Sequence, residues 1–184
     1  QEASRKLGFS AYKTMRVAQK LYEGINLNKE TSGLITYMRT DGVQISQEAI
    51  SNIREFISNE YGKNFIPESP RYYKSKAANA QEAHEAIRPT NFTYSPKLIS
   101  KYLDKDQLKL YDLIWKRTIA SQMLPAKLKQ TSVIISNTDT DFRASGQIIV
   151  FPGYMKIYVE GKDNPSKDLA DKEKPIIDAV KLEK

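Results

Sequence analysis

Residues 104–136 read DKDQLKLYDLIWKRTIASQMLPAKLKQTSVIIS, and the pattern in this stretch changes from helical to extended at Pro125. Asp104 and Gln107 stand three residues apart, as in the reciprocal cap that opens many helices, so we expect a long helix to begin here. Residues 127–136 alternate and end in a largely β-branched run, which is typical of a strand. The stretch therefore predicts helices first and strands afterwards. The expected core face of the long helix carries Leu108, Tyr111 and Trp115.

The chain before this stretch has a helical pattern. Ser10 and Ser46 each precede apolar residues at three- and four-residue spacing, and Ser95 is followed by a proline, which suits a first helical turn. The first two helices would meet at a turn containing Gly8 and resemble a helix-turn-helix unit. Residues 62–80 contain two prolines and predict a loop. The expected buried faces are Ala11, Met15, Ala18 and Tyr22 in the helix that ends near Glu23, and Ile50, Ile53 and Ile57 in the helix after Ser46; further short helices are expected at residues 1–7 and 81–87.

The chain after this stretch has the pattern of a small antiparallel sheet. Residues 137–141 have turn chemistry, and residues 142–151 read as the returning strand of a hairpin. Further strands are expected at residues 154–159 and 176–182. These patterns predict an α+β fold, with a mainly helical domain at residues 1–125 and an antiparallel β region at residues 126–184.

Length and charge narrow the classes of function. A chain of 184 residues with 40% hydrophobic residues can bury a sizeable core, and its formal net charge of +7 favours an anionic partner such as nucleic acid. The absence of cysteine excludes disulfides and thiolate metal sites. No apolar run could span a bilayer and no signal-peptide pattern opens the chain, so we expect no membrane partner. Because the first residue is Gln1 rather than methionine, we expect an excised fragment.

Residues 33–42, GLITYMRTDG, place a tyrosine two positions before an arginine. In an extended segment, Tyr37 and Arg39 would project from one face, so that a phenolic oxygen could stand beside a guanidinium group. A guanidinium is the side-chain group best shaped to hold phosphate oxygens. Tyr37 is one of eleven tyrosines, however, and most tyrosines in proteins serve packing. The spacing alone leaves both interpretations open, a packing residue or a nucleophile.

Residues 81–90, QEAHEAIRPT, contain His84, which is the one histidine of the chain. A lone histidine is more often a structural group than a catalytic one, and it cannot build a histidine-rich metal site. Glu82 and Glu85 flank it, but acidic neighbours on a short helix commonly face water, so we assign no metal ligands here. The carboxylates of Asp139 and Asp141 are interpreted as turn chemistry.

Together the two segments resemble the motifs of bacterial type IA DNA topoisomerases. In that family the active tyrosine lies in an Ile-Thr-Tyr-Met-Arg-Thr-Asp stretch, and an Ala-His-Glu-Ala-Ile-Arg-Pro stretch follows some tens of residues downstream, as in this chain. Residues 1–9 and 123–127 also look like this family. The four matches stand in the family's order, whereas residues 128–184 follow by continuity.

The resemblance implies an enzyme in which Tyr37 attacks a phosphodiester of one DNA strand, giving a 5′-phosphotyrosyl link and a free 3′-hydroxyl. Because the ester conserves the bond energy, the strand can be resealed after strand passage, and negative supercoils can be relaxed without ATP. Arg39 would hold the scissile phosphate and His84 would contact phosphate near the break. Arg88 would contact DNA, or brace the tyrosine segment or a neighbouring acid. The DNA-binding residues implied by the resemblance are Arg39, Thr40, Asp41, His84 and Arg88.

The resemblance also implies what the chain lacks. The family usually has a serine where this chain has Gly42, so one hydroxyl beside the nucleophile is lost. The family's Toprim domain, whose acidic cluster holds Mg²⁺, has no counterpart here, so we expect no cofactor in this fragment and Mg²⁺ in the parent enzyme. Residues 1–125 would be the movable tyrosine-bearing domain and residues 126–184 an incomplete part of the arch. We expect the fragment alone not to relax DNA, its partners to be single-stranded DNA and the remaining topoisomerase domains, and its location to be cytoplasmic and nucleoid-associated.

Two alternatives remain open. A non-catalytic nucleic-acid binding module could use the helix-turn-helix-like start and the basic, tyrosine-rich residues 71–74 to hold backbone phosphates. A tyrosine recombinase or type IB enzyme also uses tyrosine, arginine and histidine. Such enzymes place the tyrosine after the other groups and link it to the 3′ phosphate, whereas Tyr37 comes first in this chain.

Overall fold

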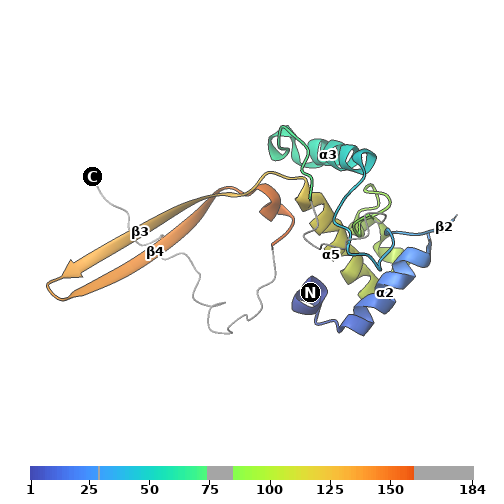
Figure 1. Cartoon of the computed structure of the whole chain (residues 1–184), viewed down its shortest axis with the longest axis horizontal. Helices are drawn as coiled ribbons and strands as arrows, with labels where there is room; N and C mark the ends of the chain where they lie inside the picture. Colours follow the sequence, from blue (N-terminus) through green and yellow to red (C-terminus); the bar gives the residue numbers. More distant parts are fainter. Residues whose placement is uncertain (29, 74–84, 160–184) are drawn as a thin grey trace.

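The computed structural model describes residues 1–28, 30–73 and 85–159, and it shows a helical body from which a long β-hairpin projects (Figure 1). This arrangement, helices first and an antiparallel hairpin afterwards, confirms the α+β prediction. The helices are α1 (Glu2–Leu7), α2 (Ala11–Glu23), α3 (Gln47–Tyr61), α4 (Pro96–Ile99) and α5 (Lys105–Ser121), with short 3₁₀ turns η1 (Lys63–Phe65), η2 (Ser100–Tyr102) and η3 (Gly153–Lys156). The strands are β1 (Ile25–Asn26), β2 (Thr31–Ser32), β3 (Lys127–Asn137) and β4 (Thr140–Phe151).

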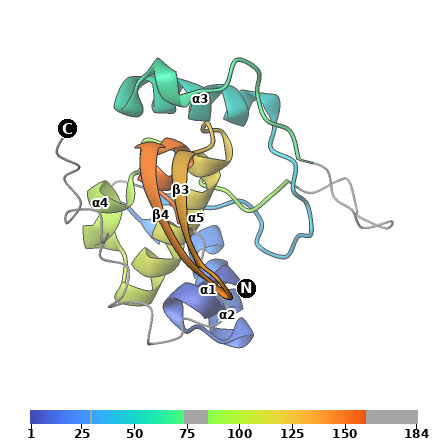
Figure 2. The ribbon, with the colours of Figure 1, turned by 90° about the vertical axis from the view of Figure 1, so that its left-hand side faces the viewer.

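Helix α5 forms the centre of the helical body. Both views place it between α3 on one side and α1 and α2 on the other (Figures 1 and 2). Of its expected core residues, Tyr111 and Trp115 are buried and Leu108 is half-buried. Tyr111 and Trp115 each use their polar atom inside the body. The Tyr111 hydroxyl donates to the carbonyl of Tyr94 at 2.8 Å, and Trp115 Nε1 donates to the carbonyl of Phe92 at 3.2 Å. These bonds tie the loop after residue 90 to α5.

The predicted helix starts are confirmed by their caps. The side chains of Ser10, Ser46 and Ser95 each accept a hydrogen bond from the first turn that follows. Asp104 and Gln107 form the reciprocal capping box expected at the start of α5.

The predicted buried face is right for α3 and only partly right for α2. Helix α3 buries Ile50, Ile53 and Ile57 as expected. Helix α2 buries Ala18 as expected, together with Val17 and Leu21, but Ala11 is exposed and Met15 and Tyr22 are 38% and 41% exposed. The stripe that contacts the body is therefore rotated from the predicted one, because α2 packs toward α5 along its Val17–Leu21 side.

Strands β3 and β4 form the predicted hairpin, but the expected strand at residues 154–159 is wrong. That segment contains η3, in which the Tyr154 amide donates to the carbonyl of Leu124 at 2.9 Å. Gly153 has a φ of 50°, and a side chain there would meet the Leu124 carbonyl at 2.4 Å. The chain thus turns back onto the helices and buries Tyr158. The expected strand at residues 176–182 lies outside the described residues; of the expected helix at residues 81–87, residues 85–87 are not helical and the rest lie outside them.

We expect Asp104→Ala to lower the free energy of unfolding by about 1 kcal/mol, because it removes the acceptor for two amides at the start of α5. Asp104→Asn should keep most of the stability, since asparagine caps helices about as well. Urea denaturation followed by circular dichroism measures both, and equal loss in the two variants would contradict the capping explanation.

Candidate active site

The first motif segment lies beside residues 86–90 of the second. Ile35 and Pro89 form an antiparallel β-bridge. On either side of it, the Thr36 amide donates to the carbonyl of Arg88 at 2.9 Å and the Thr90 amide donates to the carbonyl of Leu34 at 3.1 Å. The segment that carries Tyr37 is therefore one strand of a short pairing, and the end of the second motif is the other.

Thr36, immediately before the tyrosine, strengthens this pairing with its side chain. Its hydroxyl donates to the carbonyl of Ala86 at 2.7 Å and accepts from the amide of Arg88 at 2.9 Å. At the other end, the Thr90 hydroxyl donates to the carbonyl of Gly33 at 2.7 Å. Both hydroxyls thus bond backbone groups of the opposite segment, which fixes the register of the two motifs.

Glu85 connects this pairing to the start of α3. Its carboxylate accepts from the Ser46 amide at 2.6 Å and forms an ion pair with Arg88, with Nη2 and Oε2 at 2.7 Å. Burial acts to raise the pKa of Glu85. The hydrogen bonds from Arg88 and Ser46 and the charge of Arg88 outweigh it, so this pKa lies below its ordinary value. Arg88 also donates to the carbonyl of Pro89 at 3.0 Å, so its guanidinium braces the second motif.

The predicted nucleophile and its arginine lie on the outer side of the pairing. Tyr37 is 39% exposed and Met38 is 6% exposed, and Arg39 is exposed. The backbone bends at Thr36, Met38 and Arg39, so this stretch is not the continuous extended segment that the sequence predicted. Asp41 is also exposed, and the half-buried Thr40 accepts a hydrogen bond from the amide of Gly42 at 2.9 Å. The phenol ring is therefore carried at the surface rather than in the core.

The last turn of α2 contacts the backbone of the same segment at Gly33 and Leu34. The amide of Leu34 donates to the carbonyl of Leu21 at 2.8 Å, and both leucine side chains are fully buried. At Gly33, a β-carbon would lie 2.6 Å from the carbonyl oxygen of Tyr22. Glycine is thus required here by the close approach of two backbones.

One predicted site residue lies outside the described residues, and two residues that support the site were not predicted to do so. His84 lies outside the described residues, so its place relative to Tyr37 stays a prediction. Thr36 and Glu85 were not singled out as functional, although a hydroxyl beside the candidate nucleophile was a usable signal for Thr36.

Within residues 1–28, 30–73 and 85–159, no three histidine, cysteine, aspartate or glutamate side chains gather in a way that could hold a metal ion. None of the helices described combines the length and apolar character needed to cross a bilayer.

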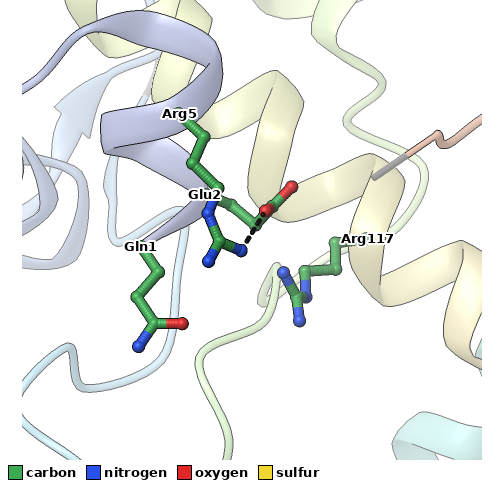
Figure 3. Close-up of a pocket in the computed structure, with 4 residues that line it drawn as sticks. All are labelled: Gln1, Glu2, Arg5 and Arg117. Atoms are coloured by element: carbon green, nitrogen blue, oxygen red, sulfur yellow. Dashed lines mark hydrogen bonds and ion pairs between the residues drawn. The ribbon is translucent and has the colours of Figure 1, made fainter. Parts of the chain in front are cut away.

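A separate hollow lies between the start of α1 and α5 and is lined by Gln1, Glu2, Arg5 and Arg117 (Figure 3). Arg5 Nη1 lies 3.3 Å from Glu2 Oε1, and Glu2 also accepts from the hydroxyl of Tyr158. These contacts join α1 to the returning segment after the hairpin. The hollow is therefore part of the packing of the helical body and contains none of the predicted site residues.

We expect Gly33→Ala to lower the free energy of unfolding by about 1–3 kcal/mol, because the added methyl group must displace the backbone of Tyr22 or its own segment. Chemical denaturation measures this change. Ser32→Ala, at the preceding half-buried position, is the matched control and should stay within about 0.5 kcal/mol of the wild type. Equal stability of Gly33→Ala and the control would contradict the close approach.

The lowered pKa of Glu85 makes its contribution dependent on pH. A carboxylate with a depressed folded pKa stabilises the fold fully above its ordinary pKa of 4.5 and loses that contribution as the pH falls through the folded value. Glu85→Gln should therefore be less stable than the wild type near neutral pH, by at most about 1 kcal/mol because the pair is partly exposed. The difference should shrink as the pH falls below 4.5.

Urea denaturation at a series of pH values checks this expectation, with Glu55→Gln at an exposed position of α3 as the control. A difference between wild type and Glu85→Gln that is the same at every pH would refute it.

Comparisons with known proteins identify the family that this chain is similar to. The model of the DNA topoisomerase family matches residues 1–184. DNA topoisomerase 1 of Rickettsia conorii is 54% identical over 170 residues, which cover 91% of this chain and 22% of that protein. DNA topoisomerase 1 of Xylella fastidiosa is 52% identical over 170 residues, covering 91% and 21%. The structure of full-length topoisomerase I from Thermotoga maritima matches with a TM-score of 0.70 at 38% identity, covering 89% of this chain and 26% of that one.

The chain thus spans about a fifth of the length of the curated relatives that it matches. The family model matches the whole of the given sequence. The chain belongs to the type IA DNA topoisomerase family.

Proposed function

We propose that this chain supplies the nucleophile of a type IA DNA topoisomerase, an isomerase that cuts one DNA strand, allows strand passage and reseals the break. The observation that carries the proposal is the exposed ring of Tyr37 at the edge of a segment braced by the second motif. Relaxation of negative supercoils without ATP follows from storing the bond energy in a phosphotyrosyl ester.

In the proposed step, the phenolic oxygen of Tyr37 forms a bond to a backbone phosphorus as the bond from that phosphorus to the 3′ oxygen breaks. The phenol loses its proton and the departing 3′ oxygen gains one, so the products are a 5′-phosphotyrosyl link and a 3′-hydroxyl. Religation is the reverse displacement. Because each step exchanges one phosphate ester for another, neither needs an outside energy source.

Arg39 is proposed to hold the scissile phosphate and to stabilise the charge of the transition state. It is exposed two residues after Tyr37 with a buried methionine between them, which supports a shared outer face. His84 is proposed to contact phosphate near the break, and Thr40 and Asp41 to line the path of single-stranded DNA. The guanidinium of Arg88 is ion-paired with Glu85. This contact supports a bracing role for Arg88 more strongly than it supports the proposed contact with DNA.

The parent enzyme's Mg²⁺ does not fit the carboxylates beside Tyr37. Glu85 is occupied by Ser46 and Arg88, and Asp41 stands on the exposed side of the segment. We propose that the ion is held by a Toprim domain elsewhere in the parent chain, and no step above depends on it. Residues 1–125 would act as the tyrosine-bearing domain and residues 126–184 as part of the arch, in a cytoplasmic, nucleoid-associated enzyme.

In the full-length polypeptide that contains this chain, Tyr37→Phe should reduce the covalent adduct with a single-stranded oligonucleotide to below detection, because phenylalanine has no nucleophilic oxygen. Tyr12→Phe, which changes a tyrosine that is 77% exposed on α2, is the matched control and should form the adduct normally. Denaturing gels of the trapped complex measure both.

The position of the label in that complex separates the alternatives. A label at the 3′ end of the oligonucleotide should stay with the protein, whereas retention of a 5′ label would indicate a type IB or recombinase-like linkage. DNA binding without any adduct would favour a non-catalytic module. The 184-residue chain alone should leave supercoiled plasmid unchanged, and full relaxation by it would refute the need for the other domains.

A further inference from the structure

The ring of Tyr22, on the last turn of α2, meets the ring of Tyr37 edge to face. Their centroids are 5.4 Å apart and their planes are inclined at 70°. This is a favoured geometry for two aromatic rings, because the positive edge of one faces the negative face of the other. The two rings are 41% and 39% exposed, so the contact lies at the surface of the helical body and not in its core.

The backbones that carry the two rings are fixed relative to each other. The Leu34 amide bonds the carbonyl of Leu21, and Gly33 packs directly against the carbonyl of Tyr22. On the other side, the hydroxyl of Thr36 bonds the second motif. The backbone of residues 33, 34 and 36, just before Tyr37, is therefore held in place, and the Tyr22 ring packs against the Tyr37 ring from the helix to which this backbone is bonded.

We propose that Tyr22 is a positioning residue that holds the Tyr37 ring in the orientation from which its oxygen attacks phosphate. This inference rests on the function proposed above. In-line displacement requires the phenolic oxygen to stand at a defined place, and a ring held beforehand in that orientation lowers the entropic cost of reaching it. The contact is between ring surfaces, so the Tyr22 hydroxyl is not required and phenylalanine should serve equally well.

The first test is made on the 184-residue chain with ¹³C-labelled tyrosine. The Tyr37 ring signal is identified by its loss in Tyr37→Phe. Tyr22→Ala should shift that signal, because the neighbouring ring current is removed, whereas Tyr22→Phe should leave it nearly in place. Tyr12→Ala on the same helix is the control and should not move it. A Tyr37 signal that is unmoved by Tyr22→Ala overturns the inference, whatever the cleavage assay shows.

The second test measures cleavage in the full-length polypeptide. Tyr22→Ala should slow adduct formation by roughly three- to tenfold, in line with the strength of one edge-to-face pair, with DNA affinity unchanged. Tyr22→Phe should restore the rate to within about twofold of the wild type. An unchanged rate in Tyr22→Ala, a loss in Tyr22→Phe equal to that in Tyr22→Ala, or a loss explained by weaker DNA binding overturns the inference.

Failure of the proposed function would look different. It would appear as no adduct in the wild type, or as an adduct that survives Tyr37→Phe, independently of position 22. In either case the catalytic part of the inference falls with it, and the spectroscopic test still decides whether Tyr22 fixes the Tyr37 ring.

Discussion

The pairing between residues 33–36 and 86–90 fixes the geometry of the tyrosine segment. Only one β-bridge is involved, yet backbone bonds flank it and two threonine hydroxyls reinforce it with backbone partners across the gap. Without it, the segment from the end of α2 to the start of α3 would be a long connection with few fixed points. Because an unpaired backbone group is costly to bury, each bond in this pairing also helps the segment to lie against the core.

The pairing explains how an exposed side chain can be held firmly. Leu34 and Ile35 are buried beneath the segment, and the backbone bends at Thr36, after which the Tyr37 side chain is exposed. Glu85 extends the same network to the first turn of α3 through the Ser46 amide. The candidate nucleophile is thus carried on a connection between helices, while its support comes from two helices and a second chain segment. A site of this kind combines access for a large substrate with a fixed position.

The helix starts could be predicted from the sequence because they depend on interactions between residues that are close together in the chain. The caps at Ser10, Ser46 and Asp104 depend on side chains and amides a few residues apart, so the sequence contains all the information needed. The rotated face of α2 and the turn at residues 153–156 depend on what packs against them. In the second case, a backbone bond to Leu124 outweighs the strand pattern. The supporting roles of Thr36 and Glu85 depend in part on partners that are distant in the sequence, because Thr36 bonds Ala86 and Arg88 and Glu85 bonds Ser46. The ion pair of Glu85 with Arg88, by contrast, joins residues only three positions apart.

The contacts that hold the tyrosine segment lie in the helical body and not at the tip of the hairpin. Its register pairs Val133 with Ala144 and Ile135 with Phe142 on one face. The other face carries serine and glutamine pairs but also the apolar pair of Leu128 and Ile149, so apolar side chains are exposed on both faces. A lone two-stranded ribbon is only marginally stable. Its base, however, is held by the ring of Phe151 against Phe65 at 4.9 Å and by the returning segment on Leu124. The core and the tyrosine segment are therefore held by contacts within the helical body. These contacts do not depend on what the ends of β3 and β4 bind.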